Sequence, residues 1–257
     1  MMKWKAIGQS VIGTSHTQSG KTCEDAICYT VVEQADGTEV LLCCVSDGAG
    51  SAKHAAEASS FITDEFIRLL AEHITGGDDI NEATLLDIFE HVYDAFVAKA
   101  EERNEPLNEF SCTLLGCVLY DDKTVFFQTG DGAVIRDDGT GSYVTIWWPQ
   151  NGEYSNTTNF FIDDAAFSNI KILVINEHVR EVGIFTDGLQ LLALNNEVMS
   201  VHQPFFAGMF KWLRKAKTAD DIAVLDKKLA EYLGGTLINS RTDDDKTLFL
   251  ATRMIDE

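Results

Sequence analysis

The order of apolar and polar segments in this chain predicts an α+β fold in which antiparallel sheets carry helices on their outer faces. Short apolar runs that end in Asp-Gly or Asp-Asp turns recur along the sequence and are typical of strands. Two long amphipathic stretches separate the early strands from a later run of strands, which is not the strict alternation of a doubly wound sheet. The length of 257 residues, with 45% hydrophobic and 24% charged residues, fits one sizeable globular domain.

The first half of the chain contains three predicted strands and two predicted helices. Strands are predicted over 4–12, 26–33 and 40–46, and the last of these (VLLCCVS) is continuously apolar, the pattern of a strand buried on both faces. Apolar residues recur at helical spacing in 52–73 and again in 82–103. These two helices therefore each present an apolar stripe that must pack against a sheet.

The second half begins as a meander of short strands and ends with two helices and a final strand. Helices are predicted over 204–215 and 219–233. A polar, turn-rich stretch around 150–168 predicts a surface flap within a single domain that spans 1–257. The strands predicted in this half are 113–120, 124–128, 134–136, 143–148, 170–175, 182–186 and 247–253.

The charge balance excludes several classes of protein. With 20 Lys+Arg against 41 Asp+Glu, the net charge is −21, so the chain would repel nucleic acids and anionic membranes. The sequence has no signal-peptide pattern and no apolar run near the ~20 residues that a membrane span needs. The 6 cysteines form no Cys-x-x-Cys pair. Free thiols and a cytoplasmic location are expected, rather than zinc or disulfides.

Acidic residues gather where the apolar runs end. Asp47-Gly48, Asp131-Gly132 and Asp187-Gly188 each follow such a run, and Asp243-Asp244-Asp245 precedes the last strand. A single Asp-Gly is more often a turn than a site. Four acidic strand ends, however, predict a cluster of mutually repelling carboxylates that needs cations, and oxygen ligands without histidine or thiolate favour Mg²⁺ or Mn²⁺.

Five motifs, in order along the chain, hold these aspartates. They are Cys23-Glu24-Asp25-Ala26, Val45-Ser46-Asp47-Gly48-Ala49-Gly50, Ser111-Cys112-Thr113 with Gly130-Asp131-Gly132, Thr186-Asp187-Gly188, and Asp244-Asp245-Lys246-Thr247. Together they resemble the metal-dependent protein phosphatases of type 2C, and most closely a small bacterial subgroup. The resemblance extends from Gly13 to Ala251. It implies a four-layer α-β-β-α sandwich of two antiparallel sheets flanked by helices.

The resemblance also implies metal-binding roles for the matched residues. Asp47 would bridge two Mn²⁺ or Mg²⁺ ions, and the Gly48 carbonyl would bind one of them. Asp187 and Asp244 would complete the shell of the other ion. Bacterial members can hold a third metal, here with Asp131 and Asp187.

The same resemblance implies a mechanism and partners. Asp25 would orient metal-bound water, with Glu24 an outer ligand. A metal-bridging hydroxide would attack the phosphorus of phosphoserine or phosphothreonine in line, without a phosphoenzyme. The implied partner is a phosphorylated protein, the substrate of a cognate serine/threonine kinase.

Two positions depart from the family pattern. The arginine that usually grips the substrate phosphate is replaced by Gly20, so Lys21 or His16 is the expected substitute. A histidine that serves animal members as a candidate general acid is replaced by Ala49, and His54 is the candidate substitute.

Other functions compete with this interpretation. Residues 15–22 (SHTQSGKT) nearly match a phosphate-binding loop of nucleotide hydrolases, but Ser15 replaces its first glycine and a predicted strand replaces the helix that must follow. A catalytically weak or inactive phosphatase-like binding module would explain the missing arginine, yet not the retained carboxylates. No acidic loop matches the calcium ligand pattern Asp-x-Asp-x-Asp-Gly.

Overall fold

The computed structural model describes residues 4–149, 158–163 and 165–254. Contacts within it divide the chain into two compact units, each built from segments that lie far apart in the sequence. Unit 1 comprises Met1–Cys23, Gly132–Trp148 and Val179–Glu257. Unit 2 comprises Glu24–Asp131 and Pro149–His178. Each unit contains one five-stranded antiparallel sheet with helices against it.

The sheet of unit 2 has the strand order β2-β3-β4-β5-β8, and every neighbouring pair is antiparallel. All residues of β4 and β5 are buried, which accounts for their continuous apolar sequences. The strands are β2 (Asp25–Glu33), β3 (Glu39–Asp47), β4 (Leu114–Leu119), β5 (Thr124–Thr129) and β8 (Lys171–Ile175).

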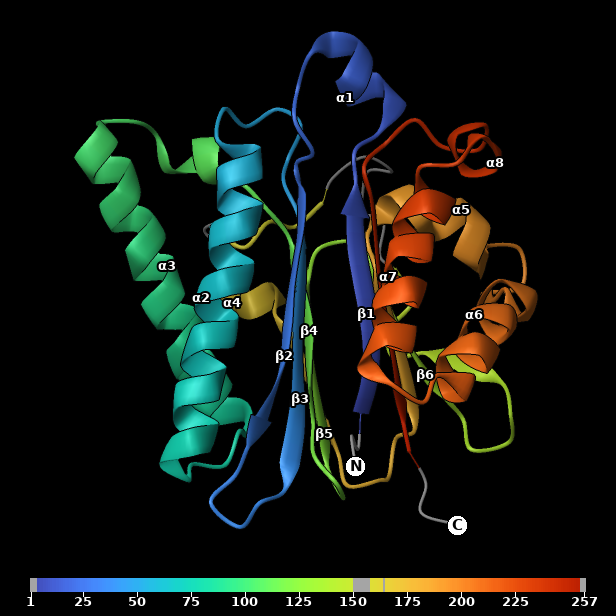
Figure 1. The fold of residues 1–257 in the computed structure, drawn as a ribbon. Coiled ribbons are helices and arrows are strands. Elements are labelled where there is room, and N and C mark those ends of the chain that lie inside the picture. Colours follow the sequence, from blue (N-terminus) through green and yellow to red (C-terminus); the bar gives the residue numbers. More distant parts are fainter. Residues whose placement is uncertain (1–3, 150–157, 164, 255–257) are drawn as a thin grey trace. The chain divides into compact units, whose positions relative to one another are not determined.

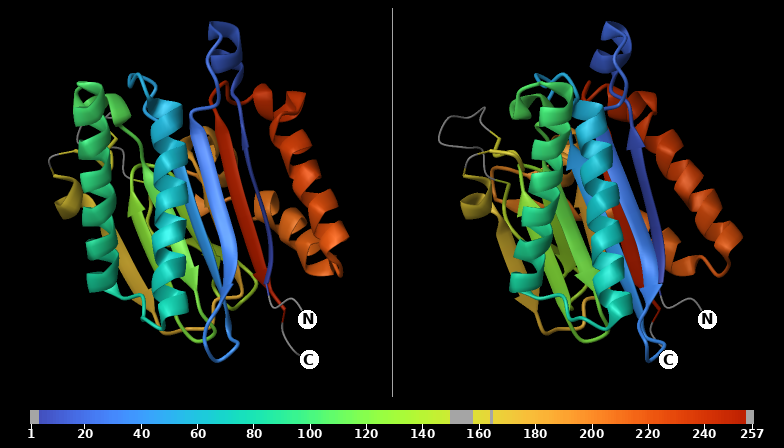
Figure 2. Two further views of the ribbon diagram at one scale, coloured as in Figure 1. Left: turned by 60° about the vertical axis from the view of Figure 1, so that its left-hand side comes forward. Right: turned by 90° about the vertical axis from the view of Figure 1, so that its left-hand side faces the viewer.

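Helices α2 (Ala55–Gly76) and α3 (Glu82–Arg103) supply the helical layer of unit 2, and Figure 2 shows them side by side along its strands. Their apolar stripes meet the strands in one hydrophobic cluster. The rings of Phe66 and Phe89 lie 4.9 Å apart in this cluster, and each buried side chain of this size contributes about 2–3 kcal/mol. Two short helices, η1 (Leu107–Phe110) and α4 (Ala166–Asn169), complete the unit.

The sheet of unit 1 has the strand order β1-β12-β9-β6-β7. Strand β12, the last in the sequence, lies between the first strand and β9, and all its residues are buried. A two-stranded hairpin of β10 (Leu194–Asn195) and β11 (Ser200–Val201) lies outside this sheet. The five strands are β1 (Trp4–Val11), β6 (Ala133–Asp137), β7 (Tyr143–Thr145), β9 (Glu181–Phe185) and β12 (Lys246–Arg253).

Helices α6 (Gln203–Lys215) and α7 (Ala219–Leu233) pack against β1 and β12 in unit 1 (Figure 1). Helix α7 begins at a capping box in which Thr218 and Asp221 exchange side-chain-to-backbone hydrogen bonds. Aromatic side chains of α6 lie in the hydrophobic core of this unit. The remaining short helices are α1 (Thr14–Ser19), η2 (Asp187–Leu189), α5 (Gln190–Ala193) and α8 (Thr236–Asn239).

The predicted α+β class, with two antiparallel sheets flanked by helices, is confirmed. Some boundaries differ from the prediction. The helix predicted over 52–73 runs from Ala55 to Gly76, and the strand predicted over 143–148 ends at Thr145. The short helices and the two-residue hairpin strands were not predicted, because elements of one or two turns carry no recognisable hydrophobic period.

The prediction of a single domain over 1–257 stays a prediction, since each unit has its own sheet and core. Of the flap predicted around 150–168, residues 150–157 and 164 lie outside the described part of the chain. The 6 cysteines are free thiols, and four of them are buried. None of the helices formed by the described residues is long and apolar enough to cross a bilayer.

Candidate metal centre

The sheet of unit 2 brings two of the predicted carboxylates opposite each other. In the antiparallel register of β2 and β3, Asp25 at the start of β2 is the direct partner of Asp47 at the end of β3. The Gly48 amide donates a hydrogen bond to the Glu24 carbonyl oxygen at 3.0 Å, so the pairing continues past the strand ends. Glu24 and Asp25 are buried, each 7% exposed. Sheet register alone therefore places Asp25 beside Asp47.

Thr113 fixes the backbone of Asp47 from the other side. Its hydroxyl accepts a hydrogen bond from the Asp47 amide at 2.9 Å, and its own amide donates to the Asp47 carbonyl oxygen at 2.8 Å. The next residue along, Gly48, forms an isolated bridge to Cys112. The sequence marked Thr113 only as part of a motif, and its role in positioning Asp47 was not predicted.

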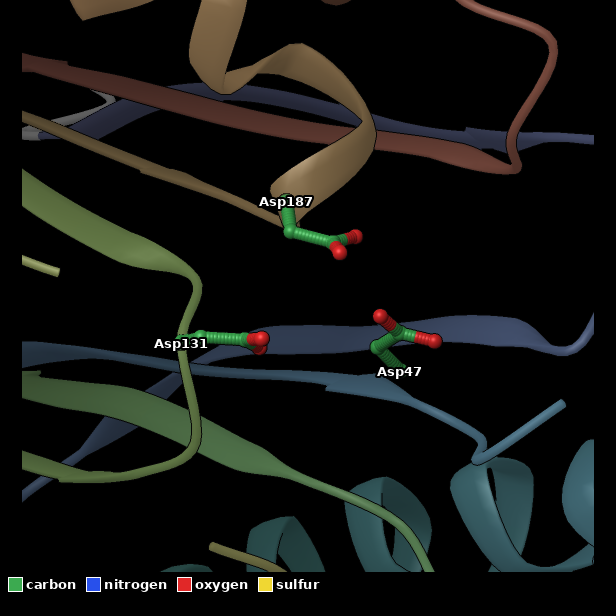
Figure 3. Close-up of side chains that lie close together, drawn as sticks. All are labelled: Asp47, Asp131 and Asp187. Carbon is green, nitrogen blue, oxygen red and sulfur yellow. The ribbon is translucent and has the colours of Figure 1, made fainter. Parts of the chain in front are cut away.

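Asp131 joins this group from the turn after β5. A carboxylate oxygen of Asp131 and one of Asp47 lie within 4.8 Å of each other, close enough to share a cation (Figure 3). Both side chains are half-buried. The Thr158 hydroxyl donates a hydrogen bond to Asp131 Oδ2 at 2.6 Å. Asp187, the third side chain drawn in Figure 3, belongs to unit 1 and follows β9.

Gly48 must be a glycine for steric reasons. A Cβ at this position would lie 2.5 Å from the Ala55 carbonyl oxygen at the start of α2. Real Cβ atoms do not approach an oxygen this closely, so the loop after Asp47 packs tightly on the helix N-terminus. The sequence predicted a metal-binding carbonyl here, and the structure adds a packing reason for the residue type.

Unit 1 assembles a second acidic group, made by β9 and β12. The Thr247 amide donates to the Thr186 hydroxyl at 3.0 Å, which ties the residue before Asp187 to β12. A Cβ at Gly188 would lie 2.0 Å from the Asp245 carbonyl oxygen and 3.4 Å from Asp244 Cβ. The Asp187 and Asp244 loops are therefore in direct contact, and their shared metal shell stays a prediction.

The segment after β1 meets the segment before β12 at Asp245, to which the sequence did not assign a role. Asp245 is 3% exposed, and its Oδ2 lies 2.9 Å from His16 Nδ1. Its Oδ1 accepts a hydrogen bond from the Gly13 amide at 2.6 Å. Asp245 therefore fixes the orientation of the His16 ring, one of the two predicted phosphate contacts.

The missing arginine position has a conformational explanation. Gly20 ends helix α1 with φ of 72°, in the left-handed region, and among the described residues no atom beyond its chain neighbours lies within 4 Å of the place of a Cβ. A side chain is disfavoured there by backbone strain and not by crowding. Lys21, the other predicted phosphate contact, follows this cap and is exposed. Because β2 and no helix follows, the segment does not form the phosphate-binding loop of nucleotide hydrolases.

Lys246 and His54 contact carboxylates and carbonyl groups of their own units. Lys246 is fully buried, and its Nζ donates to Asn239 Oδ1 and to the Asp244 carbonyl oxygen, both at 3.0 Å. The His54 ring contacts the Glu105 carboxylate and stacks on Phe110 with centroids 4.7 Å apart. These contacts tie His54 to the region after α3, so its predicted catalytic role stays a prediction without support from its surroundings.

The donor chemistry fits a hard divalent cation. The predicted ligands offer carboxylate and carbonyl oxygens, with no imidazole or thiolate, which suits Mg²⁺ or Mn²⁺. Loss of hydration and, further, the neighbouring Asp245 and Asp243 charges raise the pKa of Asp244. A bound cation would relieve this repulsion, because it interacts favourably with every carboxylate in the group.

Comparison with known proteins agrees with these motifs. A model described as protein phosphatase 2C matches residues 12–234. Serine/threonine-protein phosphatase 3 of Escherichia coli (strain K12) is 34% identical over 251 residues, which cover 97% of this chain and 98% of that protein.

Solved structures show the same fold at lower sequence identity. The crystal structure of a bacterial serine phosphatase aligns with a TM-score of 0.62 at 16% identity, covering 98% of both chains. The serine/threonine phosphatase Stp1 from Staphylococcus aureus aligns with a TM-score of 0.61 at 18% identity, covering 100% of this chain and 96% of that one. At these identities the likeness concerns the fold alone.

Proposed function

This chain belongs to the protein phosphatase 2C family, and we propose that it removes phosphate from phosphoserine and phosphothreonine side chains of other proteins. The observation that carries the proposal is the half-buried carboxylate pair of Asp47 and Asp131, held within 4.8 Å in unit 2. Two carboxylates at that distance repel each other, and a cation bound between them would offset this repulsion, which supports a metal site here. The name of the Escherichia coli relative supports serine and threonine as the phosphorylated residues.

We assign two Mn²⁺ or Mg²⁺ ions to this chain. A third ion is included in the proposal, because bacterial members of the family can hold one. When bound, such ions lower the pKa of coordinated water and neutralise the charge of an incoming phosphate. This neutralisation matters here because the net charge of −21 would otherwise repel the substrate. The proposed ligands are Asp47, Gly48, Asp131, Asp187, Asp244 and, as an outer ligand, Glu24.

The residues of the chain itself contribute orientation and proton handling. Asp25, buried opposite Asp47, accepts a hydrogen bond from the attacking water and orients it in line with phosphorus. His16, aligned by Asp245, and the exposed Lys21 bind the phosphate oxygens in place of the arginine. A lysine supplies a point charge without the planar fork of arginine, so we expect a weaker grip.

The whole chain, including the flap around 150–168, acts as one phosphatase domain in this proposal. The family match over residues 12–234 contains segments of both units, which supports this organisation. The proposed partner is a phosphoprotein made by a cognate serine/threonine kinase in a cytoplasmic signalling pathway. The cysteine usage supports the cytoplasm, because free thiols persist in a reducing compartment.

Phosphate release from a phosphothreonine peptide, titrated with Mn²⁺, tests the proposal. Wild type should require the metal, and Asp47→Asn should lose turnover. Asp138→Asn is the matched control, since Asp138 also precedes a glycine but lies in an exposed turn of unit 1. Wild type that binds Mn²⁺ poorly and releases no phosphate would instead identify a phosphatase-like binding module.

A further inference from the structure

Unit 1 contains a cavity at the end of its sheet opposite to Asp187 and Asp244. The cavity has a volume of about 340 Å³ and opens where β6 and β12 end and β9 begins. Asp187 follows the other end of β9, six residues beyond Glu181, which corresponds to about 20 Å along an extended strand. All of the residues that line the cavity belong to unit 1. It is therefore separate from the proposed metal ligands.

Three arginines line this cavity in a strongly acidic protein. They are Arg180, Arg214 and Arg253, which come from three different parts of unit 1. The carboxylates in the lining are Asp137 and Glu181, so the charged groups of the wall sum to one positive charge. With a net charge of −21 for the whole chain, a positive wall is a local exception that favours an anion.

The two carboxylates hold the wall in shape. Asp137 Oδ1 accepts hydrogen bonds from the amides of Arg180 and Glu181, both at 2.9 Å. Glu181 accepts from the Tyr143 hydroxyl at 2.7 Å and from Arg214 Nη1 at 2.6 Å. It also accepts from the Thr252 hydroxyl at 3.0 Å. These bonds engage Asp137 Oδ1 and both carboxylate oxygens of Glu181 within the wall itself.

Arg253 is the most buried of the three arginines. It is 5% exposed, and its guanidinium lies over the ring of Trp4, 4.9 Å from the centroid. Burial lowers the pKa of Arg253, although a guanidinium remains charged at neutral pH. The indole Nε1 of Trp4 is also buried and, within the described part of the chain, has no hydrogen-bond partner. Burying a hydrogen-bond donor without an acceptor costs free energy. The buried indole N–H therefore marks a corner of the unit where an additional acceptor would be favourable.

We propose that this cavity binds a phosphoryl group, carried either by free phosphate or by a small phosphate monoester. A guanidinium donates two parallel hydrogen bonds to a phosphate, and the several oxygens of a phosphoryl group serve more than one arginine at once. The volume exceeds what one phosphate fills, which leaves room for the organic part of an ester. The proposal concerns a site apart from catalysis and does not depend on the proposed reaction.

The indole N–H signal of Trp4 reports on this site in a two-dimensional NMR spectrum. The signal is assigned with Trp4→Phe, and the Mg²⁺-loaded protein is titrated with inorganic phosphate and separately with a sugar monophosphate. We expect a saturable shift of the Trp4 signal with both ligands. An ester that binds more tightly than phosphate identifies the small molecule as the ligand, and equal or weaker binding identifies free phosphate.

Two arginine variants and one control test the assignment. Arg180→Gln and Arg253→Gln should weaken binding at Trp4 by tenfold or more, whereas Arg68→Gln, which removes the same charge from the surface of α2, should not. Arg180 is exposed, so its variant remains informative if Arg253→Gln fails to fold. The proposal is wrong if phosphate leaves the Trp4 signal unmoved, or if all three variants bind equally well.

Discussion

The two units hold their acidic loops in different ways. In unit 2, Asp47 is fixed by sheet register and by the hydroxyl and amide of Thr113. In unit 1, the loop before β12 is held by a contact of His16 with Asp245 and by a hydrogen bond from the buried Lys246 to the Asp244 carbonyl group. Neutral groups therefore position the first loop, whereas the second is also contacted by a histidine and a buried lysine.

This difference teaches where negative charge is left for a metal. The Thr113 hydroxyl and amide position the backbone of Asp47 without supplying a positive charge, so a cation would be attracted to its carboxylate. In unit 1, Asp245 already faces an imidazole, and the adjacent Asp244 is the proposed metal ligand. Each unit thus separates a positioning group from a ligand, although the means differ.

The largest effect is expected from removing a proposed ligand in either unit. Asp47→Asn and Asp187→Asn should each lower kcat about 10³-fold or more, corresponding to ~4 kcal/mol of lost transition-state stabilisation. The measurement is Mn²⁺-dependent phosphate release, with Asp138→Asn as the control. Full activity of either variant would show that the aspartate it replaces is not a required metal ligand.

The next largest effect is expected for the glycines that follow Asp47 and Asp187, and it concerns the stability of the fold. Gly48→Ala and Gly188→Ala place a Cβ at 2.5 Å and 2.0 Å from a carbonyl oxygen, respectively, and should each lower the free energy of unfolding by about 1–3 kcal/mol. Gly76→Ala in α2 has open space and should be neutral or slightly stabilising. Denaturant unfolding measures all three. Equal stability of the three variants would show that the two loops are not tightly packed.

A smaller effect is expected from removing the imidazole that contacts Asp245 in unit 1. His16→Gln should raise KM for a phosphopeptide about tenfold, or ~1.4 kcal/mol, with little change in kcat or Mn²⁺ affinity. His73→Gln is the matched control, because the His73 ring also faces a carboxylate, that of Asp78 at 3.0 Å, but lies on the surface of α2. A loss of Mn²⁺ affinity in His16→Gln would indicate a role in metal binding instead.

The smallest effect concerns stability without metal. The pKa of Asp244 is raised in the folded state, so the folded protein favours the protonated carboxyl, and ionisation destabilises the fold as pH rises through this pKa. Metal-free Asp244→Asn should therefore be more stable than wild type at pH 7, by no more than about 1 kcal/mol because the side chain is exposed to solvent.

Thermal unfolding of both metal-free proteins across pH measures this difference. The gain should vanish below about pH 4, where an aspartate is protonated in the folded and unfolded states alike. A variant that gains stability equally at pH 3 and pH 7 would show that the effect is not electrostatic. Added Mn²⁺ should stabilise wild type more than the variant.

The sequence by itself was enough to predict the fold class and to identify the acidic residues at the strand ends. The run before Asp47 reads as a strand buried on both faces, because such burial removes polar positions, and the runs before Asp131 and Asp187 read as apolar strands; strands β3, β5 and β9 were found there. The acidic ends of those strands were visible for the same reason, since a charged residue interrupts each apolar run. Hydrophobic period and turn chemistry are local properties, and local properties can be read along one chain.

Only the tertiary structure decided which residues meet. The pairing of Asp25 with Asp47 depends on strand register, and the contact between His16 and Asp245 joins residues 229 positions apart. It also explained Gly20 as the left-handed cap of a helix too short to predict. A repeating pattern shows that a residue is buried or exposed, but its partner depends on how whole elements pack, which no short stretch of sequence contains.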